Sequence, residues 1–422
     1  KLFQLNHQNN LSMSKYKFIL CINFILFIRI LSAQDTLRPV SREHRDSIKR
    51  GMNMDAIYNR PFLRNKSFPV AIGGYIETNT EYASTNGVDD GFHFQFRRMT
   101  MFMSSTIASR IKFLSEIEYE NGTQEISLET ALMDLEFTPG LNLRGGILLN
   151  PIGGFNQNHD GPRWEFVDRP LVSTEIIPST LSSTGMGFYG KFYSRQWILG
   201  YEAYVTNGLS DALILNEEDR TSFHEAKENP NKFFRSNSGL PMINGKLALR
   251  HRALGEIGIS MLTGVYNQWK TAGTVVDSKR SATLAAIDFN TSLWNGKINI
   301  TGEWVKGFVQ LPDNYIQRYG SQQTGFFCDV VASVFQGQIF GWPQARIMTG
   351  LRLDFADYNQ DSEKGTDRKL FDDVWGITPA LSFRPSGSTV LRLNYKYLRT
   401  RDILGNTPSK TGVIQLGLSS YF

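Results

Sequence analysis

The side chains best suited to chemistry gather between positions 156 and 175 of this 422-residue chain. A guanidinium group stays ionised at every relevant pH and can bind an oxyanion through two parallel hydrogen bonds, so Arg163 and Arg169 could form an anion-selective constriction. The whole candidate group comprises His159, Asp160, Arg163, Glu165, Asp168 and Arg169. The alternative is that the two arginines pair with Asp160, Glu165, Asp168 or Glu175 and anchor this stretch to its surroundings.

Catalytic or metal chemistry has weaker support in the same stretch. His159 and Asp160 are adjacent, and two adjacent ligands without a third at useful spacing make a poor metal site. Ser173, Ser179 and Ser182 lie nearby, but none belongs to a nucleophile-elbow motif. The chain also lacks a phosphate-binding P-loop and a dinucleotide glycine fingerprint. We therefore predict no catalytic residue, no metal and no cofactor.

The elements that must position these groups are amphipathic β-strands. From position 72 onward, segments of about ten residues alternate apolar and polar side chains, and residues typical of turns separate them. Strands of a soluble β-sandwich average about five or six residues, whereas strands that cross a membrane need about nine to eleven. The pattern predicts an all-β fold, a transmembrane antiparallel β-barrel of about 16 strands; the inward-folded constriction loop of this fold is implied by a family resemblance given below.

The predicted strands follow from the alternation. They are 71–83, 92–107, 110–121, 125–138, 140–150, 185–194, 196–207, 242–254, 256–268, 281–293, 297–309, 326–339, 345–358, 374–385, 388–400 and 412–422. Within 125–138 the alternation slips, because Leu128 and Leu132 share one face while Met133 takes the other, and this slip indicates a β-bulge. Short turns on one side and long loops on the other are typical of outer-membrane barrels, and 151–184 is one of the long loops.

The inward faces of the predicted strands carry both signs of charge. The basic lumen residues are Arg97, Arg110, Lys112, Arg144, Arg250, Arg352 and Arg392. The acidic ones are Glu77, Glu81, Glu116, Glu118, Glu120, Glu129, Glu202, Glu303 and Asp354. Mixed signs in the lumen place strong anion selectivity in doubt.

The N-terminal region has the anatomy of an export signal. An apolar run at 18–31 follows Lys15 and Lys17 and precedes the small residues Ser32 and Ala33, so cleavage is predicted after Ala33. Residues 1–33 are thus an extension with a signal peptide, 34–70 a periplasmic segment and 71–422 the barrel. Four bases and no acids precede the cleavage point, so most of the net charge of +5 leaves with the signal, and nucleic acid is not an expected partner.

The stretch from Pro151 to Gly190 resembles a known family. The likeness rests on Asn156, His159–Asp160, Asp168–Val172, Ile176–Pro178 and Gly185, with Phe96–Arg98 and a looser similarity over 74–422. This sequence resembles the phosphate-selective porin O and P family of outer-membrane porins, in particular its Bacteroidetes-type members. The resemblance implies a sixteen-stranded barrel, a homotrimer, a loop that narrows the pore and passage of anions.

Together these features predict a porin of the bacterial outer membrane. We expect passive diffusion of small hydrophilic solutes, with a weak preference for phosphate-like anions left open. Expected partners are outer-membrane lipid and the barrel-assembly machinery, which would read the last strand and its terminal aromatic residues Tyr421 and Phe422. The alternatives are a structural or adhesive barrel with little conductance, and an outer-membrane enzyme that depends on His159.

Overall fold

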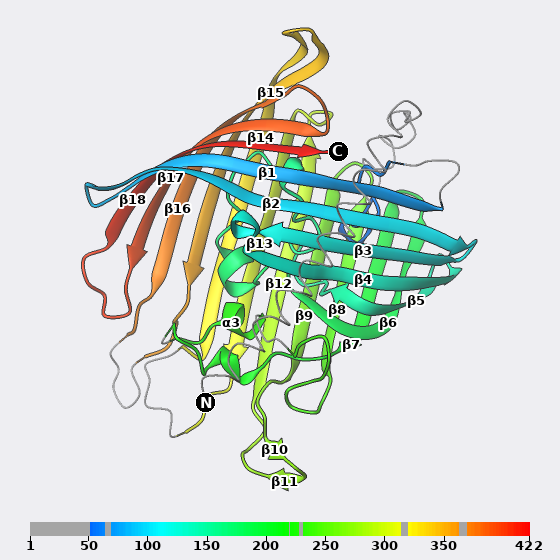
Figure 1. Ribbon diagram of the computed structural model, residues 1–422, viewed down its shortest axis with the longest axis vertical. Helices are drawn as coiled ribbons and strands as arrows, with labels where there is room; N and C mark the ends of the chain where they lie inside the picture. The colour runs from blue at the N-terminus through cyan, green and yellow to red at the C-terminus, as the bar shows by residue number, and fades with distance from the viewer. Residues whose placement is uncertain (1–50, 64–68, 219, 228–230, 314–319, 363–368) are drawn as a thin grey trace, which may run out of the picture.

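The computed structural model describes residues 51–63, 69–218, 220–227, 231–313, 320–362 and 369–422. Its main feature is a closed barrel in which each of sixteen strands pairs antiparallel with its neighbours, and β1 closes on β18 (Figure 1). The predicted all-β barrel of sixteen strands is confirmed. The proposed signal peptide and its cleavage point lie outside the described residues.

The strand bounds agree closely with those expected from the alternation. The barrel strands are β1 (Val70–Thr85), β2 (Val88–Ala108), β3 (Ile111–Glu120), β4 (Glu125–Thr138), β5 (Leu141–Leu149), β6 (Ser182–Ser194), β7 (Trp197–Thr206), β8 (Met242–His251), β9 (Gly255–Val265), β12 (Ser281–Leu293), β13 (Ile298–Val309), β14 (Gln322–Ile339), β15 (Trp342–Asp357), β16 (Asp373–Arg384), β17 (Thr389–Arg401) and β18 (Ser409–Tyr421). A hairpin of β10 (Lys270–Thr271) and β11 (Thr274–Val275) and the helix α3 (Phe223–Lys227) lie in long connections. Short helical turns are η2 (Asn53–Asp55), η3 (Asn121–Thr123), η4 (Gly161–Arg163), η5 (Val172–Ile176) and η6 (Asp211–Leu213).

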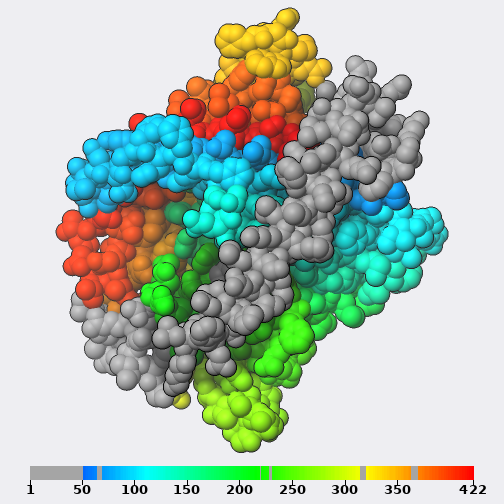
Figure 2. Space-filling view, viewed as in Figure 1, coloured from blue at the N-terminus to red at the C-terminus, as the bar shows by residue number. Residues whose placement is uncertain are grey.

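The two ends of the barrel differ in their connections. At the short-turn end, tight turns join pairs such as β6–β7 and β14–β15. This is also the end at which β1 begins and β18 ends. The long-loop end carries the connections 150–181, 207–241 and 266–280. Figure 1 shows the β14–β15 turn and the β10–β11 hairpin at opposite ends, and Figure 2 shows this hairpin projecting from the surface. The asymmetry is that of outer-membrane barrels, whose short turns face the periplasm.

The barrel wall is apolar outside and polar inside. In β9, Ile257 and Ile259 point outward and are more than half exposed, at 53% and 55%, whereas Glu256 and Ser260 point inward and are buried. The same alternation recurs in β8, β16 and β18. Among the described residues, none of the helices has the length and apolar character needed to cross a bilayer.

The outward apolar face gives a direct test of lipid contact. Ile259 faces outward beside Ile287 of β12, so in water an arginine there would be harmless, but in a bilayer a charged side chain on the lipid face costs up to about 2–4 kcal/mol. We expect Ile259→Arg to lower the free energy of unfolding in lipid vesicles by that order, measured by urea titration. His224→Arg on the exposed face of α3 is the control. Equal stability of the two variants would contradict a lipid-facing belt.

The slip in alternation within β4 corresponds to a bulge. Glu116 of β3 pairs with Thr130, whereas the next residue, Ile117, pairs with Leu128, so Glu129 is the extra residue. Glu129 and Thr130 both face inward as a result, and Leu128 is exposed on the outer face like Met133 five positions on. The bulge predicted for this strand is confirmed, and it restores the apolar outer face on both sides of the extra residue.

Candidate functional site

The connection 150–181 folds into the barrel and is anchored to strands around its wall. We call it the inner loop. The backbone amides of Gly154 and Phe155 donate to Glu303 of β13 at 2.7 and 3.0 Å. The amide of Leu171 donates to Asp354 of β15 at 3.1 Å. Charged acceptors on inward strand faces thus satisfy loop amides that would otherwise be buried without a partner, which holds the loop across the lumen.

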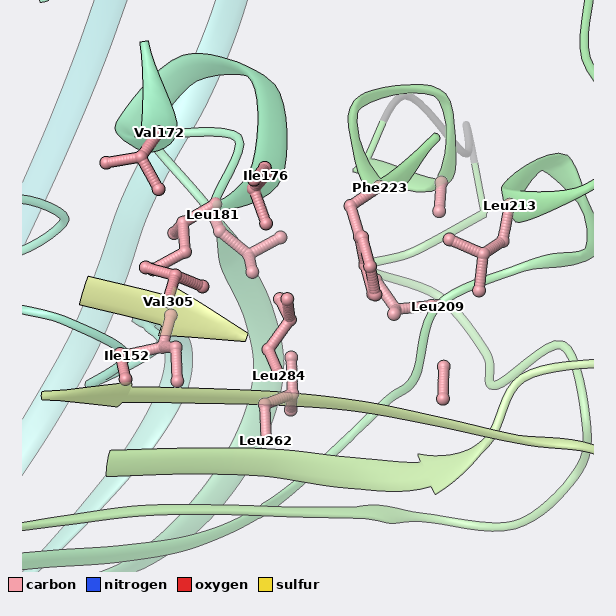
Figure 3. Close-up of a cluster of buried hydrophobic side chains, with 14 of the residues drawn as sticks. Ile152, Val172, Ile176, Leu181, Leu209, Leu213, Phe223, Leu262, Leu284 and Val305 are labelled. Carbon is pink, nitrogen blue, oxygen red and sulfur yellow. The ribbon is translucent and has the colours of Figure 1, made fainter. Parts of the chain in front are cut away.

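An apolar cluster fills the space between the inner loop and the wall at the long-loop end. We call it the lumen core. It combines loop residues such as Val172 and Ile176 with inward strand residues such as Leu284 and Val305, all fully buried. Figure 3 shows these side chains pointing toward one another, with Phe223 and Leu213 from the connection 207–241 beside them. Part of the lumen is therefore dry and packed.

The two loop arginines bind protein groups. Arg163 donates from Nη1 to Asn158 at 2.9 Å and from Nε to the Tyr421 hydroxyl at 3.1 Å. Arg169 donates from Nη1 to the Ser179 carbonyl at 2.8 Å, and its Nη2 lies 3.7 Å from Glu118. Of the two roles considered for these arginines, their geometry favours anchoring over binding of a passing anion.

The loop carboxylates are paired with bases on the wall. Glu165 accepts from Nε of Arg384 at 2.6 Å. Asp168 accepts from Arg97 at 2.6 Å and from Lys396 at 2.8 Å. Burial raises the pKa of Asp168, but the positive charges of Lys396 and Arg97 outweigh it and hold this pKa well below its ordinary value. The carboxylate is therefore charged at neutral pH, and it pairs with the predicted lumen base Arg97 and with Lys396.

His159 and Asp160 lie beside a third possible metal ligand, which the sequence placed on an inward strand face but did not link to them. Glu116 of β3 lies 3.4 Å from Nε2 of His159, and one possible ligand atom from each of Glu116, His159 and Asp160 falls within 4.8 Å of the others. This set could suit a metal by ligand type, but the guanidinium of Arg60 lies between the two carboxylates. Burial lowers the pKa of His159, while its hydrogen bond to Glu116 and the nearby carboxylates raise this pKa overall above its ordinary value.

Most of the predicted lumen bases also have acidic partners. The shortest contacts of five of them are Arg144–Asp134 at 2.7 Å, Arg352–Asp329 at 2.7 Å, Arg392–Glu77 at 2.7 Å, Lys112–Glu136 at 2.5 Å and Arg250–Glu256 at 3.7 Å. Arg110 is a correction to the sequence prediction. It lies in the turn between β2 and β3, exposed, and donates to the Phe137 carbonyl instead of lining the lumen, because β3 begins one residue later.

The described part of the N-terminal segment also lies inside the barrel. Residues 51–63 precede β1 and pack against inward strand faces at the short-turn end, where Tyr58 donates to Asp134 at 2.7 Å and Asn53 donates to Asp288 at 3.1 Å. The sequence predicted a periplasmic N-terminal segment over 34–70 and left open whether it enters the lumen; its residues 51–63 pack against inward strand faces inside the barrel. Sequence reasoning missed Arg60 as a site residue because no periodicity or motif in this polar stretch sets it apart.

Comparisons with known proteins identify the fold. No protein-family model matches the chain. An uncharacterized protein of Aquifex aeolicus (strain VF5) is 35% identical over 147 residues, which are 33% of this chain and 32% of that protein. The chain thus matches about a third of the length of this curated relative.

Several solved structures share the architecture. The anion-selective porin from Comamonas acidovorans has a TM-score of 0.52 at 12% identity, over 84% of this chain and 99% of that chain. The outer membrane channel DcaP of Acinetobacter baumannii has a TM-score of 0.53 at 12% identity, over 85% and 99%. Salmonella typhi OmpF, in a complex with daunomycin, has a TM-score of 0.52 at 8% identity, over 84% and 98%.

At these identities the likeness shows the fold. The chain has the closed sixteen-stranded barrel of bacterial outer-membrane porins, and its apolar outer wall and ionic interior suit the outer membrane. The narrower resemblance to the phosphate-selective porin O and P family remains a prediction from the loop motif.

Proposed function

We propose that the protein is a porin-type channel of the bacterial outer membrane through which small hydrophilic solutes diffuse passively. The observation that carries this proposal is the inner loop. It narrows a polar, charge-lined lumen from within, and its amides are held by Glu303 and Asp354 on the wall. A loop folded inside the barrel is placed to act on transport, whereas a loop outside would serve display.

The ion pairs of the lumen argue for weak selectivity. Fixed charges act strongly where water is scarce, but a base that already faces a carboxylate contributes little net field. Arg97, Arg352 and Arg392 each contact an acid at 2.7 Å or less. The weak preference for phosphate-like anions considered from the sequence therefore has no support from these pairs, and we propose a channel close to neutral in its preference.

A second candidate is favoured by the lumen core. Packed apolar side chains such as Leu284 and Val305 exclude water from part of the cross-section, which suits a structural or adhesive barrel that conducts little. An enzymatic role has less support, because the His159 ring is fully buried and its Nδ1 lies 2.9 Å from the Asn156 carbonyl oxygen. We therefore propose a protein without enzymatic activity.

Planar-bilayer recordings test the channel function. Refolded protein is expected to give stepwise conductance. The channel should prefer neither anions nor cations, so the reversal potential in a salt gradient should be near zero. Arg97→Ala should shift the reversal potential toward cations, because Asp168 then keeps one basic partner instead of two. Exposed Arg399→Ala is the control. No conductance from either the wild type or a variant with a loosened lumen would support the structural barrel instead.

The family resemblance supplies two further parts of the proposal. The chain is proposed to assemble as a homotrimer in outer-membrane lipid. It is also proposed to reach the membrane through the barrel-assembly machinery, which fits a last strand that alternates outward apolar residues and ends in exposed Phe422.

A further inference from the structure

Residues 51–63, which we call the lumen segment, are bound to the wall by apolar side chains. Met52 and Met54 pack with Ile198 and Ala248 of β7 and β8. Ile57 and Phe62 are buried in a cluster with inward residues of β1 to β5. The segment thus contacts both sides of the lumen at the short-turn end. A peptide that only trailed into the periplasm would leave these side chains exposed.

Arg60 belongs to this segment, and its guanidinium occupies a complete binding site formed by other parts of the chain. Nε and Nη2 donate to the two oxygens of Asp160 at 3.0 and 2.7 Å. Nη1 and Nη2 donate to the two oxygens of Glu116 at 2.8 and 3.1 Å. The same group lies 4.9 Å from the centre of the Phe102 ring, and the Arg60 side chain is 1% exposed.

The geometry of this site selects for a guanidinium. A planar fork of donors matches two carboxylates at once and stacks on an aromatic face, whereas an ammonium is a compact point charge. A residue that is not part of the site helps to hold it in place, because the Tyr421 hydroxyl of β18 donates to Asp160 at 2.7 Å. Asp160 belongs to the inner loop and Glu116 to the wall, so one guanidinium ties three separate parts of the chain together.

The lumen segment and the inner loop also contact each other directly. Nη2 of Arg163 donates to the carbonyls of Ala56 and Asn59 at 2.9 and 3.2 Å. Asn158 donates to the side chain of Asn53 at 3.2 Å. The inner loop enters from the long-loop end and the segment lies at the short-turn end, so the two meet across the lumen and together close more of it than either could alone.

We propose that Glu116, Asp160 and Phe102 form a guanidinium-binding site, that Arg60 occupies it, and that this contact locks residues 51–63 in the lumen as a plug. Guanidinium-bearing solutes are the chemical class that fits the same site when Arg60 leaves it. The inference rests on the proposed channel function only for its effect on conductance.

The contact of Arg60 should hold the plug strongly in the lumen but still allow it to leave. Removing one partner of a buried charge pair leaves the other charges without full compensation and is strongly destabilising. Loss of Arg60 leaves the carboxylates of Glu116 and Asp160 close together with only the longer contacts to His159 at 3.4 Å and to Arg163 at 3.6 Å, so the plug should leave the lumen far more often. The tethered guanidinium of Arg60 has an effective concentration of order millimolar at the site. A free guanidinium ion must reach a similar or higher concentration to occupy the site in its place, so it should act at about 10 mM.

The experiment compares the full chain with Arg60→Ala, Arg60→Lys and Asp55→Asn. Hydrogen exchange of the amides in 51–63, read by mass spectrometry, reports plug release without reference to conductance. We expect Arg60→Ala to speed this exchange at least about tenfold, Arg60→Lys to restore it only in part, and Asp55→Asn, which loses the more exposed pair with Lys191, to change it little.

Chemical rescue then tests the site itself. Ethylguanidinium chloride at about 10 mM should slow exchange in Arg60→Ala toward the wild-type rate, and ethylammonium chloride at the same concentration should not. If the two salts act alike, or if Arg60→Ala exchanges like the wild type, the proposal is wrong. If Arg60→Ala does not fold, Arg60→Lys takes its place. Amide exchange in Arg60→Lys at the wild-type rate would then contradict the proposal.

Conductance separates this proposal from the proposed function. A tenfold or larger rise in open-channel occupancy in Arg60→Ala, reversed by ethylguanidinium, supports both. Faster exchange with the expected salt specificity but no conductance in any variant supports the lock and contradicts the channel. Conductance that is identical in the wild type and in Arg60→Ala, with unchanged exchange, supports the channel and contradicts the lock.

Discussion

Replacing Arg352 with methionine is expected to lower the free energy of unfolding by about 3–5 kcal/mol, which is a large fraction of the stability of most domains. Arg352 binds both oxygens of Asp329 at 2.7 Å and donates from Nη1 to the Asp168 carbonyl at 2.7 Å. Its guanidinium lies 4.3 Å from the centre of the Phe166 ring. The substitution leaves the carboxylate of Asp329 buried and unpaired, and it also removes one of the contacts that hold the inner loop on β15.

Urea titration of the refolded barrel in micelles measures this effect. The double variant Arg352→Met with Asp329→Leu should recover much of the loss, because no uncompensated charge remains, and exposed Arg399→Met should be nearly silent. A single variant as stable as the wild type would show that water reaches Asp329 freely, and hence that the inner loop does not pack there.

Phe223→Ala should detach the connection 207–241 from the lumen. Phe223 is fully buried in the lumen core and lies over Gly307, where an added Cβ would come within 2.9 Å of its ring. Truncation of a buried phenylalanine costs about 3–5 kcal/mol, through lost burial and the cavity that remains. We expect the barrel to stay closed while limited proteolysis cuts 207–241 at least tenfold faster.

The same variant distinguishes the two candidate functions. If the lumen core blocks the path, its loosening should raise conductance, whereas a path that avoids the core should conduct as before. Phe234→Ala is the matched control, since Phe234 belongs to the same connection and is 83% exposed. Equal rates of proteolysis for the two alanine variants would contradict a packed core in the lumen.

Sequence periodicity predicted the wall of the barrel well. Lipid on one side and charged groups on the other force every strand to alternate, so bounds such as 125–138 and 281–293 coincide with β4 and β12. The slip in alternation within 125–138 indicated a bulge in this strand, and the structure places the extra residue at Glu129. Arg110 was misplaced because alternation loses its meaning at a turn, where no second strand pairs with the residue.

The interior of the barrel could not be predicted in the same way. The contacts of Asp160 reach β18 and the lumen segment, and its partner Tyr421 lies 261 positions away in the sequence. Irregular backbone has no period, so nothing in the sequence indicates that the segment before the first strand returns to meet the inner loop. Arginines that could bind a passing anion and arginines that anchor a loop also look alike in sequence, since only their partners differ.

The hydroxyl of Tyr421 has a consequence for the order of assembly. It supports the carboxylate that receives Arg60, yet it belongs to the last strand of the barrel in chain order, whereas Arg60 precedes the first. The site that holds the lumen segment is therefore finished only when β18 pairs with β1. We therefore expect the lumen segment to bind in full only after the wall has closed, so that closure of the barrel and binding of the segment are coupled.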